Sequence, residues 1–212
     1  MPTYYPMMVD LAGRRCLVVG GGRVAERKVA LLLECGAHVT VVSPTSTRKL
    51  ADLAAQGAIR LARRTVRPAD LDRVFLAFAA TDDAQVNQRV ADAARKAGGL
   101  ANVADAPERC DFLVPSVVRR GDLTIAISTS GGSPALAKRL RQRLDATIGP
   151  EYEAFLDALR ALRARAQEVV ADPAKRQELF RRAADSDLFE IAARGDKAAV
   201  TARISELLQR SS

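Results

Sequence analysis

The feature that most constrains the fold is a glycine-rich turn between an apolar run and an amphipathic segment, in the stretch CLVVGGGRVAERKVALLLECGA. Its GxGxxA pattern falls on Gly20, Gly22 and Ala25. The first glycine permits a tight turn, the second lets backbone approach a pyrophosphate, and the small third residue lets the helix pack closely. Free N–H groups at a helix start favour an anion. We therefore predict a dinucleotide-binding strand, turn and helix; a turn without a ligand is the alternative.

Residues 14–103 alternate between strand-like and helix-like segments. We expect strands at 15–20, 38–43, 58–63, 73–81 and 100–103, and helices at 24–35, 48–56 and 83–96. In the first helix, the residues that recur at helical spacing are Val24, Lys28, Leu31, Leu32 and Cys35, and Gly36 is placed to end it. Alternation of this kind predicts an α/β fold with a parallel sheet covered on both faces. We assign residues 1–112 to a Rossmann-type NAD(P)-binding domain.

The pattern changes after Asp111. The stretch FLVPSVVRRGDLTIAIST predicts an antiparallel hairpin that turns at residues 120–122, and the next stretch predicts a helix from about Ser133, with Pro134 at its first position. We place this hairpin and helix in a segment over residues 113–149. The Ala-, Arg- and Leu-rich remainder, broken at Pro173 and around Gly195, predicts a small all-helical domain over residues 150–212.

The composition limits the classes of molecule that this protein can be expected to bind. The formal charge of +8 favours an anionic partner, whereas aromatic residues are only 4% of the 212 and leave few platforms on which nucleic-acid bases could stack. Apolar runs fall short of the ~18 residues that span a bilayer, and the first residues lack the order of a signal peptide. We therefore expect a cytoplasmic protein with no membrane and no nucleic-acid partner.

The three cysteines and the single histidine do not predict a resident metal. Cys16, Cys35 and Cys110 lack the pairing of a disulfide framework or a zinc site, and no cluster of His, Cys and carboxylate has ligand spacing. Cys16 and Cys35 are interpreted as small buried apolar residues. For Cys110 the same interpretation is preferred to a transient metal contact, and for His38 a surface role and a functional one stay open.

The choice of dinucleotide is left open by the sequence. Where NAD-binding chains often carry an acidic residue for the ribose 2′-hydroxyl, this chain has Ser43 before Pro44. Arg23, Arg48 or Lys49 could meet a 2′-phosphate, so the cofactor is expected to be NAD, with NADP not excluded. The candidate cofactor-binding residues are Gly20, Gly22, Arg23, Val24, Ser43, Pro44, Thr45 and Thr81.

Four segments in this order, GGGRVAERK, AATDDAQVNQRV, ANVADAPERCDFLVPSVVRRGDLTIAIST and GGSPALAKRLRQRL, resemble the precorrin-2 dehydrogenase / sirohydrochlorin ferrochelatase family. This family also forms the N-terminal part of siroheme synthase. The resemblance implies NAD-dependent oxidation of precorrin-2 to sirohydrochlorin in siroheme or cobalamin biosynthesis. It also implies that residues 113–149 form a dimerisation segment, so that the protein is a homodimer.

In some members of this family, insertion of Fe²⁺ or Co²⁺ follows, with the metal as a substrate only. No methyltransferase segment follows in this sequence. We therefore expect the stand-alone form, and hand-over of the tetrapyrrole from a uroporphyrinogen-III methyltransferase stays open.

The resemblance also assigns site residues. The family's N-x-x-D motif matches Asn102 to Asp105 and makes Asp105 the expected catalytic residue, suited to accept a proton as hydride leaves the macrocycle. From the residues alone, a cap of the turn before Pro107 is the favoured role of Asp105, and the resemblance reverses that preference. Asp111 is the second candidate carboxylate. Arginine can hold a substrate carboxylate with two hydrogen bonds. The candidate substrate-binding residues are Asn102, Arg119, Arg120, Thr129, Ser130, Gly131, Ser133 and Pro134, with Lys138 beside them.

Two other classes of function remain as alternatives. The net charge and the Arg-rich residues 160–182 are compatible with an NAD(H)-sensing, DNA-binding regulator, although no recognition-helix pattern is evident. The second alternative is a scaffold that only dimerises and whose glycine loop binds no ligand. Steep salt dependence of DNA retention would favour the regulator, and failure to bind either dinucleotide would favour the scaffold.

Overall fold

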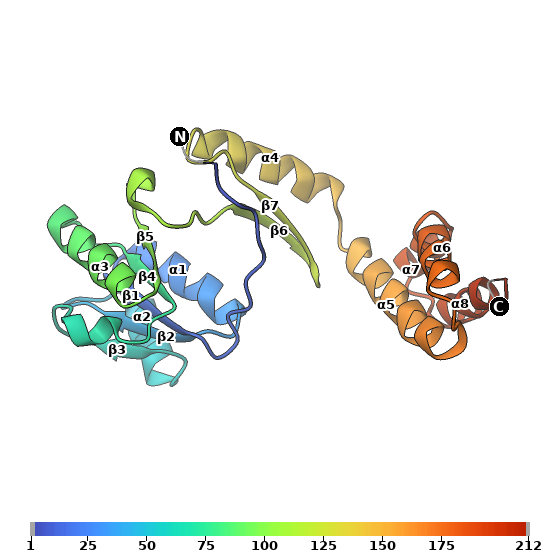
Figure 1. The fold of residues 1–212 in the computed structure, drawn as a ribbon, viewed down its shortest axis with the longest axis horizontal. Coiled ribbons are helices and arrows are strands. Elements are labelled where there is room, and N and C mark those ends of the chain that lie inside the picture. Colours follow the sequence, from blue (N-terminus) through green and yellow to red (C-terminus); the bar gives the residue numbers. More distant parts are fainter. Residues whose placement is uncertain (1–2, 211–212) are drawn as a thin grey trace. The chain divides into compact units, whose positions relative to one another are not determined.

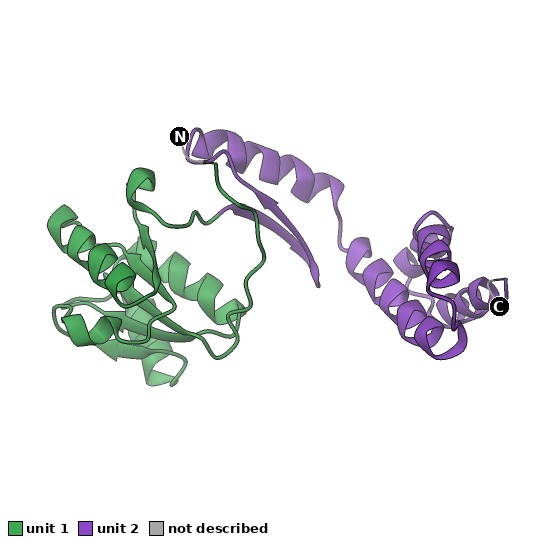
Figure 2. Cartoon of the chain, in the orientation of Figure 1, with its two compact units in different colours: residues 1–114 green, residues 115–212 purple. Residues whose placement is uncertain are grey.

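The computed structural model describes residues 3–210 and divides into two compact units, the first ending at Val114 and the second beginning at Pro115 (Figure 2). Each unit is a separate body and is described by itself. The three-part division into 1–112, 113–149 and 150–212 stays a prediction, and its outermost residues, 1–2 and 211–212, lie outside the described range.

The first unit is built on a five-stranded parallel sheet with the strand order β3-β2-β1-β4-β5 (Figure 1). Its elements are β1 (Arg15–Val19), α1 (Arg23–Glu34), β2 (His38–Val42), α2 (Arg48–Ala55), β3 (Arg60–Ala62), the 3₁₀ turn η1 (Pro68–Leu71), β4 (Leu76–Ala79), α3 (Ala84–Lys96), β5 (Leu100–Val103) and the 3₁₀ turn η2 (Pro107–Arg109). The order reverses between β1 and β4, which is where open α/β sheets bind ligands. The predicted Rossmann-type fold is confirmed.

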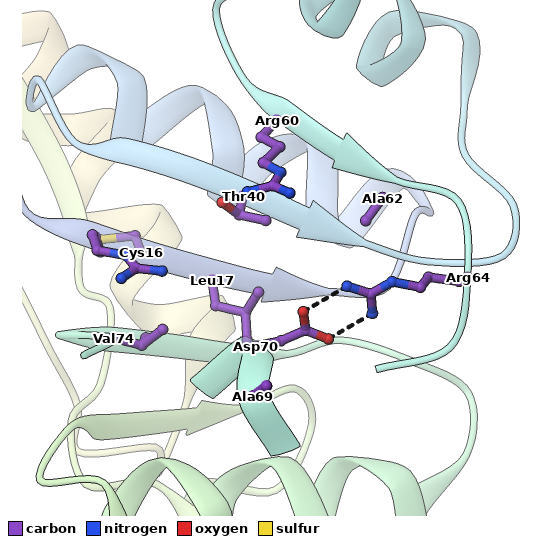
Figure 3. Close-up of a pocket in the computed structure, with 10 residues that line it drawn as sticks. Cys16, Leu17, Thr40, Arg60, Ala62, Arg64, Ala69, Asp70 and Val74 are labelled. Carbon is purple, nitrogen blue, oxygen red and sulfur yellow. Dashed lines mark hydrogen bonds and ion pairs between the residues drawn. The ribbon is translucent and has the colours of Figure 1, made fainter. Parts of the chain in front are cut away.

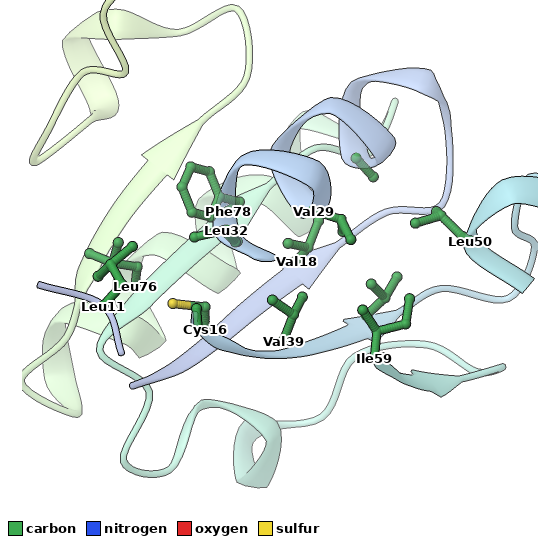
Figure 4. Close-up of a cluster of buried hydrophobic side chains, with 13 residues drawn as sticks. Leu11, Cys16, Val18, Val29, Leu32, Val39, Leu50, Ile59, Leu76 and Phe78 are labelled. Atoms are coloured by element: carbon green, nitrogen blue, oxygen red, sulfur yellow. The ribbon is translucent and has the colours of Figure 1, made fainter. Parts of the chain in front are cut away.

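Two apolar layers cover the faces of this sheet. On one face, Val18 and Val39 pack against α1 and α2 (Figure 4). On the other face, Leu17 and Val19 pack against α3 and η1. Strands buried on both faces explain why their sequences are continuously apolar rather than alternating.

The buried side of α1 differs from the predicted one. Ala25, Val29 and Leu32 face the sheet, whereas Leu31 is 40% exposed. The small Ala25 lets α1 pack closely against β1. The helix therefore turns its Ala25 side toward the sheet, and not the side that carries Leu31.

The second unit joins an antiparallel hairpin to a group of helices. Its elements are β6 (Ser116–Arg120), β7 (Leu123–Ile127), α4 (Pro134–Thr147), α5 (Glu151–Val169), α6 (Pro173–Ala184), α7 (Leu188–Ala193) and α8 (Lys197–Gln209). The hairpin turns between Arg120 and Leu123, as predicted. The last four helices enclose a core of their own that centres on Leu162, Leu179 and Leu188, all fully buried. Among residues 3–210, no helix has the length and apolar character needed to cross a membrane.

A bidentate ion pair closes the connection between β3 and β4 (Figure 3). Both terminal nitrogens of Arg64 donate to the carboxylate of Asp70, each at 2.7 Å, and Asp70 also accepts from the amide of Arg67 at 2.8 Å. The hydrogen bonds from Arg64 hold the pKa of Asp70 below its ordinary value. A carboxyl whose pKa is lower in the folded state than in the unfolded state stabilises the fold. This contribution is fully present at pH values above the unfolded-state pKa of about 4, and it is lost as the pH falls through the lower folded-state pKa.

Replacing Asp70 by asparagine therefore gives a pH-dependent loss of stability. At pH 7 the Asp70→Asn variant is expected to melt a few degrees below the wild type, and the gap is expected to narrow as the pH falls below about 4. Thermal melts of both proteins between neutral and acidic pH measure this. A gap that stays constant across that range would mean that the ion pair contributes nothing to folding.

Candidate active site

The glycine loop lies at the carboxyl end of β1, and each of its glycines meets a different environment. A Cβ on Gly20, whose φ is +121°, would lie 2.2 Å from the carbonyl oxygen of Ala80, and a Cβ on Gly21 would lie 2.0 Å from that of Thr45. A Cβ on Gly22 would meet nothing within 4 Å. The first two glycines are therefore required by packing against the neighbouring loops, and the third leaves an open approach to the start of α1.

The start of α1 suits an anion. Gly22 is its N-cap and offers no side chain to the first amides of the helix, which are then free for an anionic ligand. Arg23, the first helical residue, is exposed, and Val24 is half-buried.

The loop after β2 forms the opposite side of this approach. Ser43 is buried, Pro44 and Thr45 are exposed, and the amide of Thr47 donates to the carbonyl of Gly21 at 2.9 Å. Arg48 and Lys49 follow as exposed residues at the start of α2. Ser46 was not among the sequence candidates because no motif marks it.

Ser46 carries an observation that points to a ligand. Its hydroxyl is buried and has no hydrogen-bond partner among residues 3–210. Buried polar groups are nearly always hydrogen-bonded, so an orphan hydroxyl beside the glycine loop fits a polar group of a bound molecule. Together with the open space at Gly22, this makes the residues present compatible with a bound dinucleotide.

The loop after β4 is organised by a residue that the sequence interpretation missed. Thr81 donates from its amide and its hydroxyl to Oδ1 of Asn87, at 3.1 and 2.8 Å, and its carbonyl accepts from Nδ2 of Asn87 at 2.8 Å. Asn87 is buried in α3, and Asp83 caps that helix through the amides of Gln85 and Val86. A polar residue on the sheet-facing side of a helix was the available signal for Asn87.

Removal of the Asn87 amide should loosen this loop. The Asn87→Ala variant removes the side-chain partner of the Thr81 amide and carbonyl and leaves the Thr81 hydroxyl only the carbonyl of Asp83. This is expected to lower the free energy of unfolding by about 2 kcal/mol. Denaturant unfolding measures the loss, with Gln85→Ala, an exposed site on the same helix, as the matched control. Equal stability of the two variants would contradict a role for Asn87 in holding the β4 loop.

Asp105 lies just beyond the carboxyl end of β5, at the same edge of the sheet as the glycine loop. It is exposed, its φ is +57°, and its carboxylate makes no hydrogen bond or ion pair among residues 3–210. Aspartate is one of the few residue types that tolerate this left-handed conformation. A carboxylate that no neighbour engages is available to accept a proton.

A half-buried lysine lies in the electrostatic field of Asp105. The ammonium of Lys28, on α1, sits over the ring of Phe78 at 5.4 Å from its centroid. Burial lowers the pKa of Lys28, and the negative charge of Asp105 opposes that shift. The Lys28 ammonium therefore places a positive charge near Asp105. Among the described residues, no carboxylate forms an ion pair with it within 4 Å.

Asp111 and Asn102 hold the chain rather than face an open site. Asp111 accepts from Nε of Arg95 at 2.9 Å and from the amide of Ala101 at 2.8 Å. Asn102 is buried, and its Nδ2 donates to the carbonyl of Phe112 at 3.0 Å. The geometry thus favours Asp105 over Asp111 as the reacting carboxylate, and Asn102 as a residue that fixes the segment leaving β5.

The other candidate substrate residues belong to the second unit. Arg119 is exposed. Arg120 donates to the carbonyl and to Oδ1 of Asp145, both at 2.9 Å, so part of its guanidinium is already engaged. Thr129, Ser130 and Gly131 form a tight turn, with Ser130 and Gly131 at φ +52° and +85°. Ser133 caps α4 by accepting from the amide of Leu136, Pro134 is the first residue of α4, and Lys138 is exposed on it.

The remaining titratable candidates have structural settings. His38 is exposed at the start of β2, at the sheet edge opposite to the glycine loop. Cys16 is buried, as predicted, and burial raises its pKa to about 11, whereas Cys35 is half-buried. Within residues 3–210, no group of three or more His, Cys, Asp or Glu side chains is placed to hold a metal ion.

A cavity of about 240 Å³ lies elsewhere in the first unit. It is lined by residues of β1, β2 and β3 and by the Arg64–Asp70 pair, and it includes none of the predicted site residues (Figure 3). The candidate site is therefore the carboxyl edge of the sheet, where the loops after β1, β2, β4 and β5 meet.

Residues 7–116 match a family model described as "Putative NAD(P)-binding", and residues 120–147 match one described as "Sirohaem biosynthesis protein central". Among solved structures, one titled "SirC, precorrin-2 dehydrogenase" is similar, with a TM-score of 0.79, 30% identity, and coverage of 96% of this chain and 100% of that one. The chain belongs to the siroheme synthase and precorrin-2 dehydrogenase family. The siroheme family resemblance stated from the sequence is confirmed.

Curated relatives support the same family membership. Siroheme synthase of Methylococcus capsulatus is 38% identical over 192 residues, which are 91% of this chain and 40% of that protein. Siroheme synthase 1 of Aeromonas salmonicida is 41% identical over 196 residues, 92% of this chain and 42% of that protein. The chain thus spans about two fifths of the length of these relatives. None of these comparisons favours the DNA-binding regulator.

Proposed function

We propose that this chain oxidises precorrin-2 to sirohydrochlorin, with NAD⁺ as the hydride acceptor. The observation that carries the proposal is the similarity over the full length of a structure titled precorrin-2 dehydrogenase. It is supported by an open glycine loop and an unengaged carboxylate at one edge of the sheet. The match of residues 7–116 to an NAD(P)-binding model supports the choice of cofactor class.

The cofactor would be held by the loops after β1, β2 and β4. The amides at the start of α1 would face the pyrophosphate, and Gly22 would leave room for it. The buried Ser46 hydroxyl would gain a hydrogen-bond partner, and Ser43, Pro44, Thr45 and Thr81 would border the same space. When bound, the dinucleotide supplies the hydride acceptor that the oxidation needs.

Asp105 would take the proton. Oxidation of precorrin-2 removes a hydride and a proton from the macrocycle, and the proton needs a base within hydrogen-bonding reach. The exposed Asp105 carboxylate has no competing partner among the described residues, and the positive charge of Lys28 is nearby. Arg119 and Lys138, exposed in the second unit, and the turn at residues 129–134 would hold the carboxylates of the substrate.

The test is an anaerobic incubation of the protein with precorrin-2 and either NAD⁺ or NADP⁺. Formation of NADH and appearance of the sirohydrochlorin spectrum support the proposal, and the ratio of the two rates gives the cofactor preference. Absence of turnover with both dinucleotides, in a protein that binds one of them, would contradict it.

Insertion of Fe²⁺ or Co²⁺ into sirohydrochlorin is the second candidate activity. It is favoured by the name of the curated relatives, siroheme synthase, and the metal would be a substrate. Metal added to purified sirohydrochlorin with and without the protein measures it directly. A homodimer, a cytoplasmic location and hand-over from a methyltransferase stay predictions; light scattering at several protein concentrations tests the first.

A further inference from the structure

The outer edge of β5 has no neighbouring strand. β5 is the last strand of the sheet, and along its inner edge the amides of Leu100 and Ala104 donate to carbonyls of β4 and the residue before it, at 3.0 and 2.9 Å. Because backbone groups alternate along a strand, Ala101 and Val103 present their amides and carbonyls to the outer edge. Such groups need partners when they are buried, as both of these residues are.

The chain folds back after η2 and supplies those partners from two consecutive residues. Asp111 accepts from the amide of Ala101 and donates from its own amide to the carbonyl of Ala101, both at 2.8 Å. Sγ of Cys110 accepts from the amide of Val103 at 3.1 Å. The thiol proton is within reach of two carbonyls, those of Val103 and Ala106, each at 3.3 Å. Asp111 and Cys110 therefore complete the strand edge in place of a sixth strand.

The two residues whose backbone groups bond the Cys110 thiol lie on either side of the Asp105 turn. Val103 is the last residue of β5, and Ala106 follows Asp105 directly. The turn between them holds Asp105 at a φ of +57°, a left-handed conformation that is uncommon outside glycine and that aspartate tolerates better than most residues. The thiol that bonds both ends of the turn is the side chain placed to enforce it.

The state of the thiol suits this role. Burial raises the pKa of Cys110, and the positive charge of Lys28 only partly opposes the shift, so the group is a neutral S–H at pH 7. A neutral thiol can accept from one backbone group while it donates to another, whereas a thiolate can only accept. Asn102 also donates to Sγ from Nδ2 at 3.5 Å, which links the thiol to the other half of the N-x-x-D motif.

We propose that Cys110 is a positioning residue for Asp105: its thiol ties Val103 to Ala106 and so fixes the direction in which the Asp105 carboxylate is presented. This rests on the proposed function, in which Asp105 accepts the substrate proton. Small displacements of a reacting group lower the rate of the chemical step more than they weaken binding, because binding contacts lie elsewhere.

The experiment compares the wild type with Cys110→Ala, Cys110→Ser and the control Cys35→Ser, a half-buried thiol at the end of α1. For each protein, kcat and KM with precorrin-2, the Kd for NAD⁺ and the exchange rate of the Val103 and Ala106 amides are measured. Cys110→Ala is expected to lower kcat about 10- to 100-fold, with KM and Kd within about threefold of the wild type. Cys110→Ser, whose hydroxyl also donates and accepts, is expected to recover most of the loss, and Cys35→Ser is expected to match the wild type.

Three results would overturn the proposal. One is wild-type kcat in Cys110→Ala; another is a loss in Cys110→Ser as large as in Cys110→Ala, since the hydrogen bonds would then not be responsible. The third is a fall in kcat accompanied by comparable rises of KM and of the Kd for NAD⁺, which would indicate a general structural defect.

Hydrogen exchange at the Val103 amide tests the role of Cys110 independently of the proposed function. A wild type that does not oxidise precorrin-2 contradicts the proposed function. Exchange of the Val103 amide still tests whether the Cys110 thiol holds Val103 to Ala106. That exchange is expected to be at least about tenfold faster in Cys110→Ala than in the wild type and in Cys110→Ser. Unchanged exchange in Cys110→Ala would show that the thiol does not hold the turn.

Discussion

The Asp105→Asn variant is expected to lose about 10²- to 10⁴-fold in kcat for precorrin-2 oxidation, the range that removal of a general base commonly produces. Asparagine is the appropriate replacement because it tolerates the left-handed φ of +57° as aspartate does, whereas alanine would add strain to the loss of the carboxylate. The Kd for NAD⁺ and the melting temperature are expected to stay close to those of the wild type, because the Asp105 side chain is exposed and bonds to no described residue.

Asp111 provides the matched carboxylate control for this prediction. Its side chain accepts from Arg95 and from the amide of Ala101, so Asp111→Asn is expected to lower stability by about 1–2 kcal/mol through the weakened pairing. The folded Asp111→Asn protein should keep most of its kcat. If instead Asp111→Asn abolishes turnover and Asp105→Asn stays within tenfold of the wild type, the two carboxylates have been assigned the wrong roles.

The second large effect separates the folding role of the glycine loop from its binding role. Gly21→Ala places a Cβ 2.0 Å from the Thr45 carbonyl, and the displacement this forces is expected to lower the free energy of unfolding by about 3 kcal/mol. Gly22→Ala places the same methyl group where nothing lies within 4 Å, so stability should change by less than about 1 kcal/mol. Its Cβ would occupy the approach to the start of α1, and the Kd for NAD⁺ is expected to rise at least about tenfold.

Denaturant unfolding and titration calorimetry measure these two effects on the same pair of proteins. Because Gly21 and Gly22 are adjacent and receive the same substitution, each variant serves as the control for the other. Wild-type affinity for NAD⁺ in Gly22→Ala would contradict the assignment of this loop to the pyrophosphate, whatever the outcome for Gly21→Ala.

The arrangement of the first unit follows from local patterns that the sequence displays. β1, β2 and β5 were predicted to within one residue because each is an apolar run bounded by a glycine, a proline or a polar cluster. β4 begins at Leu76, three residues after the predicted start at Arg73. Arg73 adopts a φ of +55° and turns the chain, which no apolar pattern reveals.

The helical end of the chain was predicted only in outline. Pro173 begins α6 as its first residue, and Gly195 separates α7 from α8, as the two breaks suggested. The further break at residues 185–187 was not predicted, because Asp185, Ser186 and Asp187 are compatible with a helix interior as well as with a cap. Their actual role depends on packing among the four helices.

The candidate site was predicted where a motif marks it and missed where tertiary contacts create it. Asp105 and the glycines belong to patterns that can be read along the chain, whereas the orphan hydroxyl of Ser46 and the thiol bonds of Cys110 exist only because loops from different strands meet. The pairing of Arg120 with Asp145 likewise joins residues of β6 and α4 and could not be foreseen from either segment.

The most direct test of the central claim is the yield of NADH when the wild type is incubated anaerobically with a known amount of precorrin-2 and excess NAD⁺. The account predicts NADH and sirohydrochlorin in equal amounts from the wild type and only a trace of either from Asp105→Asn. No NADH from a wild type that binds NAD⁺, or equal yields and rates from the two proteins, would contradict it.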